Sequence, residues 1–423
     1  MLIKTKMVYN ENDKYEAGEE ALKERAIYRG AKNNDLTQIN SELLLQILRK
    51  KGTCSRVELA KETGLTQAGI TKLVSSMIEQ QIVRESGIFG QNERGRKSIG
   101  LQINEELGKV VCVNISMTFM KVAIYDVNGN VYNNVTIPLL QFHSLDDAML
   151  HLTDLIKEYI VAFPDIRSIG VALPDACLKR SGGIAFLDSG YDWVSFRPLE
   201  ALEERFHMPI YPIHDADAAV YSYKWRSDMK PHKTLVYMLL GEEVSAGLVV
   251  DDKLFEGSFG NAAQIGHVSI DINGRKCSCG NRGCLERYCS TGALVEDAKR
   301  AFAEHPESGL SQYKNLTYFD IFNEYEKMDP LAVSLVTQAC RYVGYGVVNL
   351  IHAYSPDVVV LGNVLTRAGD TLERSVRQVI EERVSPALVE RVEIRTEKPG
   401  SDSILHGCAM YAIDHLIDTV LAQ

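Results

Sequence analysis

The feature that most constrains this chain is a cluster of one histidine and three cysteines in a short, glycine-containing segment. His267 is followed by Cys277, Cys279 and Cys284. Three thiolates and an imidazole satisfy the tetrahedral preference of Zn²⁺, and glycines let a short loop fold back around an ion. A disulfide framework fits less well, because three clustered cysteines would leave one unpaired. The spacing therefore predicts a zinc site with these four ligands.

A metal site closed by four protein ligands has no vacant position for a substrate, so this zinc is expected to be structural. Its role would be to hold a loop and the residues beside it. Gln264 and Glu286 flank the ligands. Together with His267, they are candidates for one wall of a polar binding site.

Length and composition limit the class of protein. The chain has 423 residues, of which 45% are hydrophobic, so it can form two or three domains. No apolar run approaches the length of a membrane span, and the first residues lack the apolar core of a secretory signal. Thiolate ligands and scattered single cysteines favour a reducing compartment. We therefore expect a cytoplasmic protein without a membrane partner.

Charge is distributed unevenly along the chain. The net charge is −10, but residues 36–104 contain ten Lys or Arg and six acids, a net charge of +4, which leaves −14 for the rest. A basic module on an acidic body is typical of a DNA contact confined to one end.

Residues 36–104 have the pattern of a helix-turn-helix. A first helix is indicated by apolar residues that share one face, namely Ile39, Leu43, Ile47 and Leu48. Ser55 and Glu58 form a capping box for a second helix, and Thr66 is expected to cap a third. The outward face of this third helix is suited to base edges and phosphates in a major groove. It carries Gln67, Ala68, Thr71, Lys72 and Ser75.

Two predicted strands follow, near 82–86 and 98–103, and the loop between them carries Arg94, Arg96 and Lys97. A winged helix uses such a loop to place cations along phosphates or in the minor groove. The expected partner is double-stranded operator DNA. The alternative is a three-helix module that binds protein through a polar face.

From residue 105 the pattern becomes that of an α/β protein. Predicted strands lie near 110–113, 122–125, 131–137, 169–173, 210–213, 234–240, 246–250 and 358–361, and predicted helices near 145–162, 198–206, 216–225 and from 404. Strands followed by helices, twice over, predict two α/β lobes. The expected domains are an extension at 1–35, the DNA-binding domain at 36–104, a first lobe at 105–225 completed by about 400–423, and a second lobe at 226–399. The extension, with a predicted helix near 16–28, could be a mobile arm or an oligomer contact.

The cysteine-rich segment resembles the signature of the ROK family (repressors, open reading frames and sugar kinases). That signature has Glu-x-Gly-His ahead of a Cys-x-Cys-Gly-x2-Gly-Cys-x-Glu loop. The resemblance implies an actin-like, two-lobed sugar-kinase fold over about residues 107–423. The preceding winged helix matches the repressor branch, of the xylose and N-acetylglucosamine type. In this family the His binds zinc and faces the sugar, and both Glu contact sugar hydroxyls; here Gln264 replaces the first Glu and Glu286 is retained.

The resemblance also implies a sugar site on the first lobe. The family's Asn-Asp-x-Asn motif appears as His214-Asp215-Ala216-Asp217, and its Pro-Gly loop as Pro174-Asp175. In the kinases the Asp of the first motif is the general base. The implied effector-binding set is His214, Asp215, Gln264, His267 and Glu286, with Asp215 as a vestigial base. The alternative for Asp215 is a helix cap.

Three elements that bind ATP in the family depart from its pattern. The first, Asp-x-Gly-Gly-Thr, is replaced by Asn114-Ile-Ser-Met-Thr118. The second, Gly-Thr-Gly-Ile-Gly-x-Gly, is replaced by Gly241-Glu-Glu-Val-Ser-Ala-Gly247. The third, Gly-Gly, is replaced by Gly362-Asn363. Glu242 and Glu243 would repel phosphates. We therefore expect no catalytic residues.

The leading interpretation is a transcriptional regulator, a repressor of carbohydrate genes, whose degenerate kinase-like body senses a sugar or sugar phosphate and forms a homodimer or homotetramer. One alternative is a working sugar kinase with a DNA-binding arm. Another is a regulator whose effector is a protein.

Overall fold

The computed structural model describes residues 33–89, 98–174, 193, 196–226, 232–258, 260 and 262–421. Its internal contacts separate two units, Met1–Ile103 and Asn104–Gln423. The predicted helix near 16–28, the cations of the predicted wing (Arg94, Arg96 and Lys97) and Asp175 lie outside the described residues.

The described part of the first unit contains three helices and a small antiparallel sheet. The helices are α2 (Asn33–Lys51), α3 (Arg56–Thr63) and α4 (Gln67–Glu79), and the strands are β1 (Cys54–Ser55), β2 (Val83–Phe89) and β3 (Ser98–Ile103). The sheet order is β1-β3-β2. The predicted hairpin is confirmed, whereas the two-residue strand β1, which pairs Cys54 with Leu101, was not predicted.

Side-chain caps fix where α3 and α4 begin. The amide of Glu58 donates to the Ser55 hydroxyl at 3.2 Å, and the amide of Ser55 donates to the Glu58 carboxylate at 2.8 Å, which confirms the capping box. Thr66 accepts from the amide of Gly69 at 3.1 Å. Between the helices, Gly64 adopts φ +69°, a left-handed conformation that favours glycine and ends α3.

The buried face of α2 differs from the predicted one. Its fully buried apolar residues are Leu44, Leu45 and Leu48, whereas Ile39, Leu43 and Ile47 are only partly buried. The prediction for this face was wrong, except for Leu48. Three successive leucines fit either face of a helix, so packing against α3 and β3 decides which face is covered.

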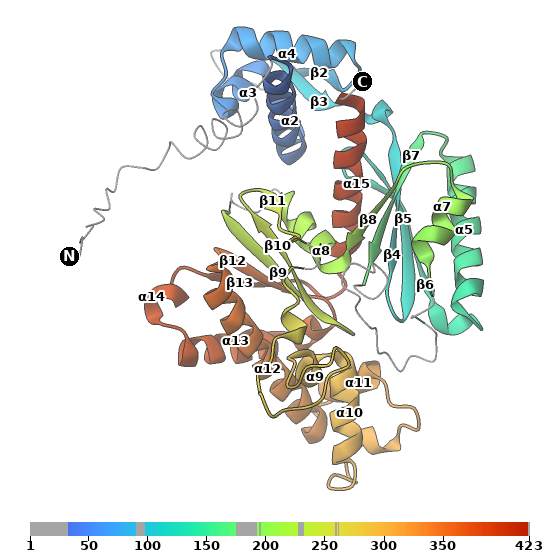
Figure 1. Cartoon of the computed structure of the whole chain (residues 1–423), viewed down its shortest axis with the longest axis vertical. Helices are drawn as coiled ribbons and strands as arrows, with labels where there is room; N and C mark the ends of the chain where they lie inside the picture. Colours follow the sequence, from blue (N-terminus) through green and yellow to red (C-terminus); the bar gives the residue numbers. More distant parts are fainter. Residues whose placement is uncertain are drawn as a thin grey trace, which may run out of the picture. The chain divides into compact units, whose positions relative to one another are not determined.

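The second unit contains two five-stranded sheets (Figure 1). The first has the order β6-β5-β4-β7-β8. Its strands are β4 (Lys109–Ile115), β5 (Phe119–Asp126), β6 (Val131–Pro138), β7 (Ile166–Leu173) and β8 (Ile210–His214). The helices α5 (Leu145–Ala162) and α7 (Pro198–Arg205) contribute apolar residues to the core of this lobe.

The second sheet has the order β11-β10-β9-β12-β13. Its strands are β9 (Thr234–Leu240), β10 (Val244–Val250), β11 (Lys253–Leu254), β12 (Val358–Gly362) and β13 (Glu393–Thr396). One face is covered by a helical layer that shares its apolar core. This layer consists of α9 (Glu286–Cys289), α10 (Thr291–Ala301), α11 (Tyr318–Glu326), α12 (Pro330–Tyr354), α13 (Asp370–Arg383) and α14 (Pro386–Val389).

Two helices connect the lobes. The helix α8 (Asp215–Lys224) packs on β9 and β10 of the second sheet and on α15 (Ser403–Leu421), and α15 packs on β4 and β7 of the first sheet (Figure 1). Gly407 allows the closest approach, since a Cβ there would lie 1.6 Å from the carbonyl oxygen of Ala218. The chain therefore returns to the first lobe at its last helix.

The helix α12 is, within the described part of the chain, the one helix long and apolar enough to cross a membrane by length and composition alone. Half of the tested window is buried inside the protein, and its buried residues belong to the core of the second lobe. This is the pattern of a core helix.

Candidate functional site

The outward face of α4 is the candidate DNA-binding surface. The five residues predicted to face outward (Gln67, Ala68, Thr71, Lys72 and Ser75) are all exposed, while Ile70, Leu73, Val74 and Met77 are buried beneath them. The Thr71 hydroxyl donates to the carbonyl of Gln67 at 2.7 Å, which leaves its methyl group on the outer face. The structure therefore brings the five predicted residues together on one accessible helix face.

The four predicted metal ligands converge in the second lobe. One ligand atom from each of His267, Cys277, Cys279 and Cys284 lies within 4.8 Å of the others. Nδ1 of His267 is 3.7 Å from Sγ of Cys277, and Sγ of Cys279 is 3.7 Å from Sγ of Cys284. Sulfur atoms placed tetrahedrally at about 2.3 Å from one ion lie about 3.8 Å apart. The cluster therefore has the size of a tetrahedral metal site.

The chemistry of this cluster also fits a cation. Burial, together with the neighbouring thiols of Cys279 and Cys277, raises the pKa of the Cys284 thiol well above its usual range. A bound cation would offset this effect, because it stabilises thiolates directly. Gly283 makes the loop possible, since its φ is +66° and a Cβ there would lie 1.7 Å from the carbonyl oxygen of Asp271.

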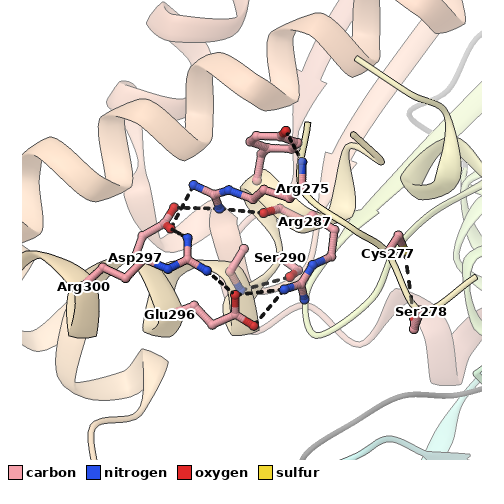
Figure 2. A network of polar contacts seen from close by, with 10 residues as sticks. Arg275, Cys277, Ser278, Arg287, Ser290, Glu296, Asp297 and Arg300 are labelled. Carbon is pink, nitrogen blue, oxygen red and sulfur yellow. Dashed lines mark hydrogen bonds and ion pairs between the residues drawn. The ribbon is translucent and has the colours of Figure 1, made fainter. Parts of the chain in front are cut away.

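A network of ion pairs anchors the metal loop to α10 (Figure 2). The guanidinium of Arg275 donates to the carbonyl of Arg287 at 2.7 Å and pairs with Asp297 at 2.9 Å. Arg287 in turn pairs with Glu296 at 2.9 Å. Arg275 within the loop and Arg287 just after it are thus tied to one helix, which also supports the neighbouring Glu286.

The residues of the predicted effector site come from separate segments that meet at β10. The amide of Val244 donates to the Glu286 carboxylate at 3.4 Å. Gly266 lies against the same residue, since a Cβ there would be 1.9 Å from the carbonyl oxygen of Val244. Gly247 lies against Ala216, since a Cβ on Gly247 would be 2.2 Å from the carbonyl oxygen of Ala216. The Gln264–His267 segment and Glu286 therefore lie against the start of β10. The start of α8 lies against the middle of the same strand.

At the start of α8, His214 is the cap residue and Asp215 is the first helical residue. The carboxylate of Asp215 accepts from the amide of Ala216 at 2.7 Å and lies 3.1 Å from Nε2 of His214. His214 is buried, and its Nδ1 lies 3.9 Å from the carboxylate of Asp217. Asp215 thus bonds the backbone of the first helical turn and also reaches a cleft, so the helix-cap interpretation and the binding interpretation are both compatible with its position.

This cleft lies between the lobes and contains about 790 Å³ of empty space, open solvent included. Its described lining includes Asp215 but not Gln264, His267 or Glu286. Five carboxylates line it, from Asp215, Glu242, Glu243, Glu397 and Asp402. Among the described lining residues Lys121 is the only cation, and it pairs with Asp402. The cleft is therefore electronegative, which disfavours a polyphosphate.

Two turns face each other across this cleft. One joins β4 to β5 and contains Met117 and Thr118; the other joins β9 to β10 and contains Glu242. The amide of Met117 donates to the Glu242 carboxylate at 3.2 Å. Partial burial raises the pKa of this carboxyl above its ordinary value, while hydrogen bonds from Thr118 and Met117 act in the opposite direction. This bond between the two turns was not predicted from the sequence.

Glu397 is a cleft residue that sequence reasoning missed. It is buried and accepts hydrogen bonds from the hydroxyls of Tyr237, at 2.7 Å, Tyr223, at 3.2 Å, and Ser403. These donors come from β9, α8 and α15. No local sequence pattern identifies such a site, because the two tyrosines that donate to Glu397 are distant from it in the chain.

Comparisons with known proteins agree with this arrangement. A family model described as "ROK family" matches residues 110–415, and one described as "Winged helix-turn-helix DNA-binding" matches residues 39–84. A xylose repressor of Caldicellulosiruptor bescii is 26% identical over 393 residues, which are 90% of this chain and 97% of the repressor. A glucokinase of Halalkalibacterium halodurans is 27% identical over 305 residues, which are 69% of this chain and 91% of the kinase.

A solved structure, described as a ROK family transcriptional regulator and homologue of the Escherichia coli Mlc protein, has the same fold with a TM-score of 0.73. It is 24% identical, and the match covers 92% of this chain and all of that one. The sequence-based expectation of a winged helix-turn-helix ahead of an actin-like, two-lobed body is therefore confirmed. Because the family model covers more than two-thirds of the sequence, the chain belongs to the ROK family.

Proposed function

We propose that this protein is a cytoplasmic, DNA-binding transcriptional repressor of carbohydrate genes. The observation that carries the proposal is the combination of an exposed α4 face, within a winged helix-turn-helix, and a ROK body on one chain. The similarity to a xylose repressor extends through both parts. Phosphorylation of a sugar does not require a helix with an exposed face of this kind in a winged helix-turn-helix.

In this proposal α4 enters the major groove of the operator. Lys72 contacts a phosphate, and the short side chains of Gln67, Ala68, Thr71 and Ser75 let the helix approach base edges closely. The wing cations Arg94, Arg96 and Lys97 add phosphate or minor-groove contacts. A homodimer or homotetramer would place two such helices on a palindromic site.

The body senses a sugar or sugar phosphate through His214, Asp215, Gln264, His267 and Glu286. Support comes from the way these segments meet at β10, since Glu286 bonds the backbone of Val244 and Gly266 lies against the same residue. Closure of the lobes on the effector would change the spacing of the DNA-binding helices in the oligomer.

A structural Zn²⁺ is held by His267, Cys277, Cys279 and Cys284. The size of the cluster and the chemistry of its donors support this assignment. Zinc supplies the cation that keeps the three thiolates ionised, and the loop then holds Glu286 and Gln264 in place. A four-ligand site has no open position for catalysis.

Phosphoryl transfer is proposed to be lost. It requires phosphate-binding turns and Mg²⁺ near the transferred group. The glycines of the first turn are replaced by Ser116 and Met117, and carboxylates of Glu242 and Glu243 line the cleft where phosphates would bind. Asp215 remains, but as a binding residue without a phosphoryl donor.

The decisive experiment measures binding of the purified protein to the DNA upstream of its own gene and of the adjacent genes, by fluorescence anisotropy. We expect specific binding that one sugar or sugar phosphate from a panel weakens at least tenfold. Constant affinity across the panel would refute a sugar effector. In that case, capture of a protein from the cell extract that also weakens DNA binding would support the protein-effector alternative.

A working kinase is the second candidate, because a glucokinase is 27% identical over most of the body and Asp215 is retained. A coupled assay of ADP release with hexoses tests it. We expect no turnover above the blank, and turnover with any hexose would overturn the proposed loss of activity.

A further inference from the structure

The turn between β4 and β5 has two hydrogen-bond donors that face the cleft. Within the turn, the hydroxyl of Ser116 accepts from the amides of Thr118, at 3.4 Å, and Phe119, at 3.2 Å. Those two amides are therefore already bonded. The amide of Met117 and the hydroxyl of Thr118 instead donate to the carboxylate of Glu242, which belongs to the other lobe.

A backbone amide and a hydroxyl on one tight turn form a small anion-binding site when both donors converge on one oxyanion, and the Thr118 hydroxyl also interacts with Tyr318 of α11. In this protein the oxyanion is part of the chain. The Glu242 carboxylate is partly buried, and burial is the main cause of its raised pKa, with the charge of Asp215 acting in the same direction. The two donors offset part of this cost, because a hydrogen bond to a charged group is stronger than one to a neutral group.

We propose that Glu242 is an internal anion that locks the first lobe to the second across the cleft, in place of a ligand phosphate. This inference rests on the proposed loss of kinase activity, because the same donors cannot hold Glu242 and a phosphate together. The proposal explains how the donors of this turn, the Met117 amide and the Thr118 hydroxyl, are hydrogen-bonded when no nucleotide is bound. This bond within the chain then links the two lobes at one point before an effector binds, and closure on the effector starts from lobes that are already linked there.

A competing explanation is that Glu242 only adds negative charge to the cleft. Glu243 provides the matched control, because it is adjacent and lines the same cleft. Removing either carboxylate changes the charge of the cleft equally. Only the loss of Glu242 removes the acceptor of the Met117 amide.

The test compares the full-length wild-type protein with E242A, E242Q and E243A by hydrogen exchange resolved to single amides. We expect the Met117 amide to exchange about tenfold faster in E242A, because its bond to a charged acceptor is lost. The amide should keep nearly wild-type protection in E243A and in E242Q, whose side chain retains an oxygen acceptor. Small-angle scattering should show a larger radius of gyration for E242A than for E243A.

Thermal melting of each variant confirms that it is folded before exchange is measured. Equal exchange at Met117 in E242A and E243A would overturn the lock, as would equal radii of gyration for these two variants. Hexose phosphorylation by the wild-type protein would overturn the proposed function. The two failures are distinguishable, since the first is read from the hydrogen bond between Met117 and Glu242 and the second from phosphorylation of a hexose.

Discussion

The backbone amide of Met117 donates a hydrogen bond of 3.2 Å to the carboxylate of Glu242, from a turn 125 positions earlier in the chain. The two residues belong to different sheets, and their turns form opposite sides of one cleft. Around them lie carboxylates rather than the cations that a polyphosphate requires. The proposed loss of kinase activity rests on this relationship more than on the loss of any single glycine.

The titration of Glu242 should be visible in the stability of the body. Burial raises its pKa above the ordinary value of 4.5, so the unfolded state ionises first as the pH rises. The wild-type protein should therefore lose stability relative to E242Q from about pH 4.5 upward, through the raised pKa of the folded state. Urea unfolding across a pH series, followed by tryptophan fluorescence, measures this difference, because both tryptophans, Trp193 and Trp225, lie in the second unit.

Asp215 and Tyr318 are titratable groups that act on Glu242 or lie beside it. Asp215 raises its pKa through charge, and the pKa of Tyr318 is itself raised to about 12 by burial, so Tyr318 stays neutral over the range. A difference between wild type and E242Q that is constant with pH, or that grows in favour of the wild type, would contradict the prediction.

Loss of one metal ligand should release the metal and loosen the loop. We expect C277S to lose its zinc and to melt several degrees lower than the wild type, because metal binding contributes directly to folding. K276A is the matched control, since Lys276 is the exposed neighbour of the ligand on its other side. Metal content by mass spectrometry and Tm by calorimetry measure the two effects. Zinc-free protein with wild-type Tm and full regulation would show that the loop has no organising role.

A cation on α4 should contribute to operator affinity through counterion release. We expect K72A to bind the operator more weakly and to reduce the slope of log K against log salt by about 1. K299A, which removes an exposed lysine from α10 in the other unit, should leave both unchanged. Anisotropy titrations at several salt concentrations test this. An unchanged slope in K72A would place Lys72 outside the phosphate contacts.

Glu286 should couple the metal loop to the effector site. Its carboxylate accepts from the amide of Val244, so E286A removes this bond as well as the proposed sugar contact. We expect normal operator binding without sugar and at least a tenfold weaker response to the active sugar. E381A, an exposed carboxylate on α13, serves as the control. A full sugar response in E286A would remove this residue from the effector site.

Local features of the fold were predictable because their causes are local. The capping box of Ser55 and Glu58 and the cap at Thr66 follow from side chains three residues from their partners. The metal ligands lie in one loop, so their spacing alone suggests tetrahedral geometry. The buried face of α2 was not predictable, because Leu44 and Leu45 compete with Ile39 and Leu43 for the same core.

The sequence by itself determined the starts of α3 and α4, the strands β2 to β10 and β12, the exposed face of α4 and the set of four clustered His and Cys side chains. Each depends on residues near one another in the chain. Only the tertiary structure decided the cleft. The bonds of Glu397 with Tyr237 and Tyr223 and the bond between Met117 and Glu242 join segments more than a hundred residues apart. Such contacts leave no periodic pattern in the sequence, because they depend on how the two sheets and the helices α8 and α15 pack.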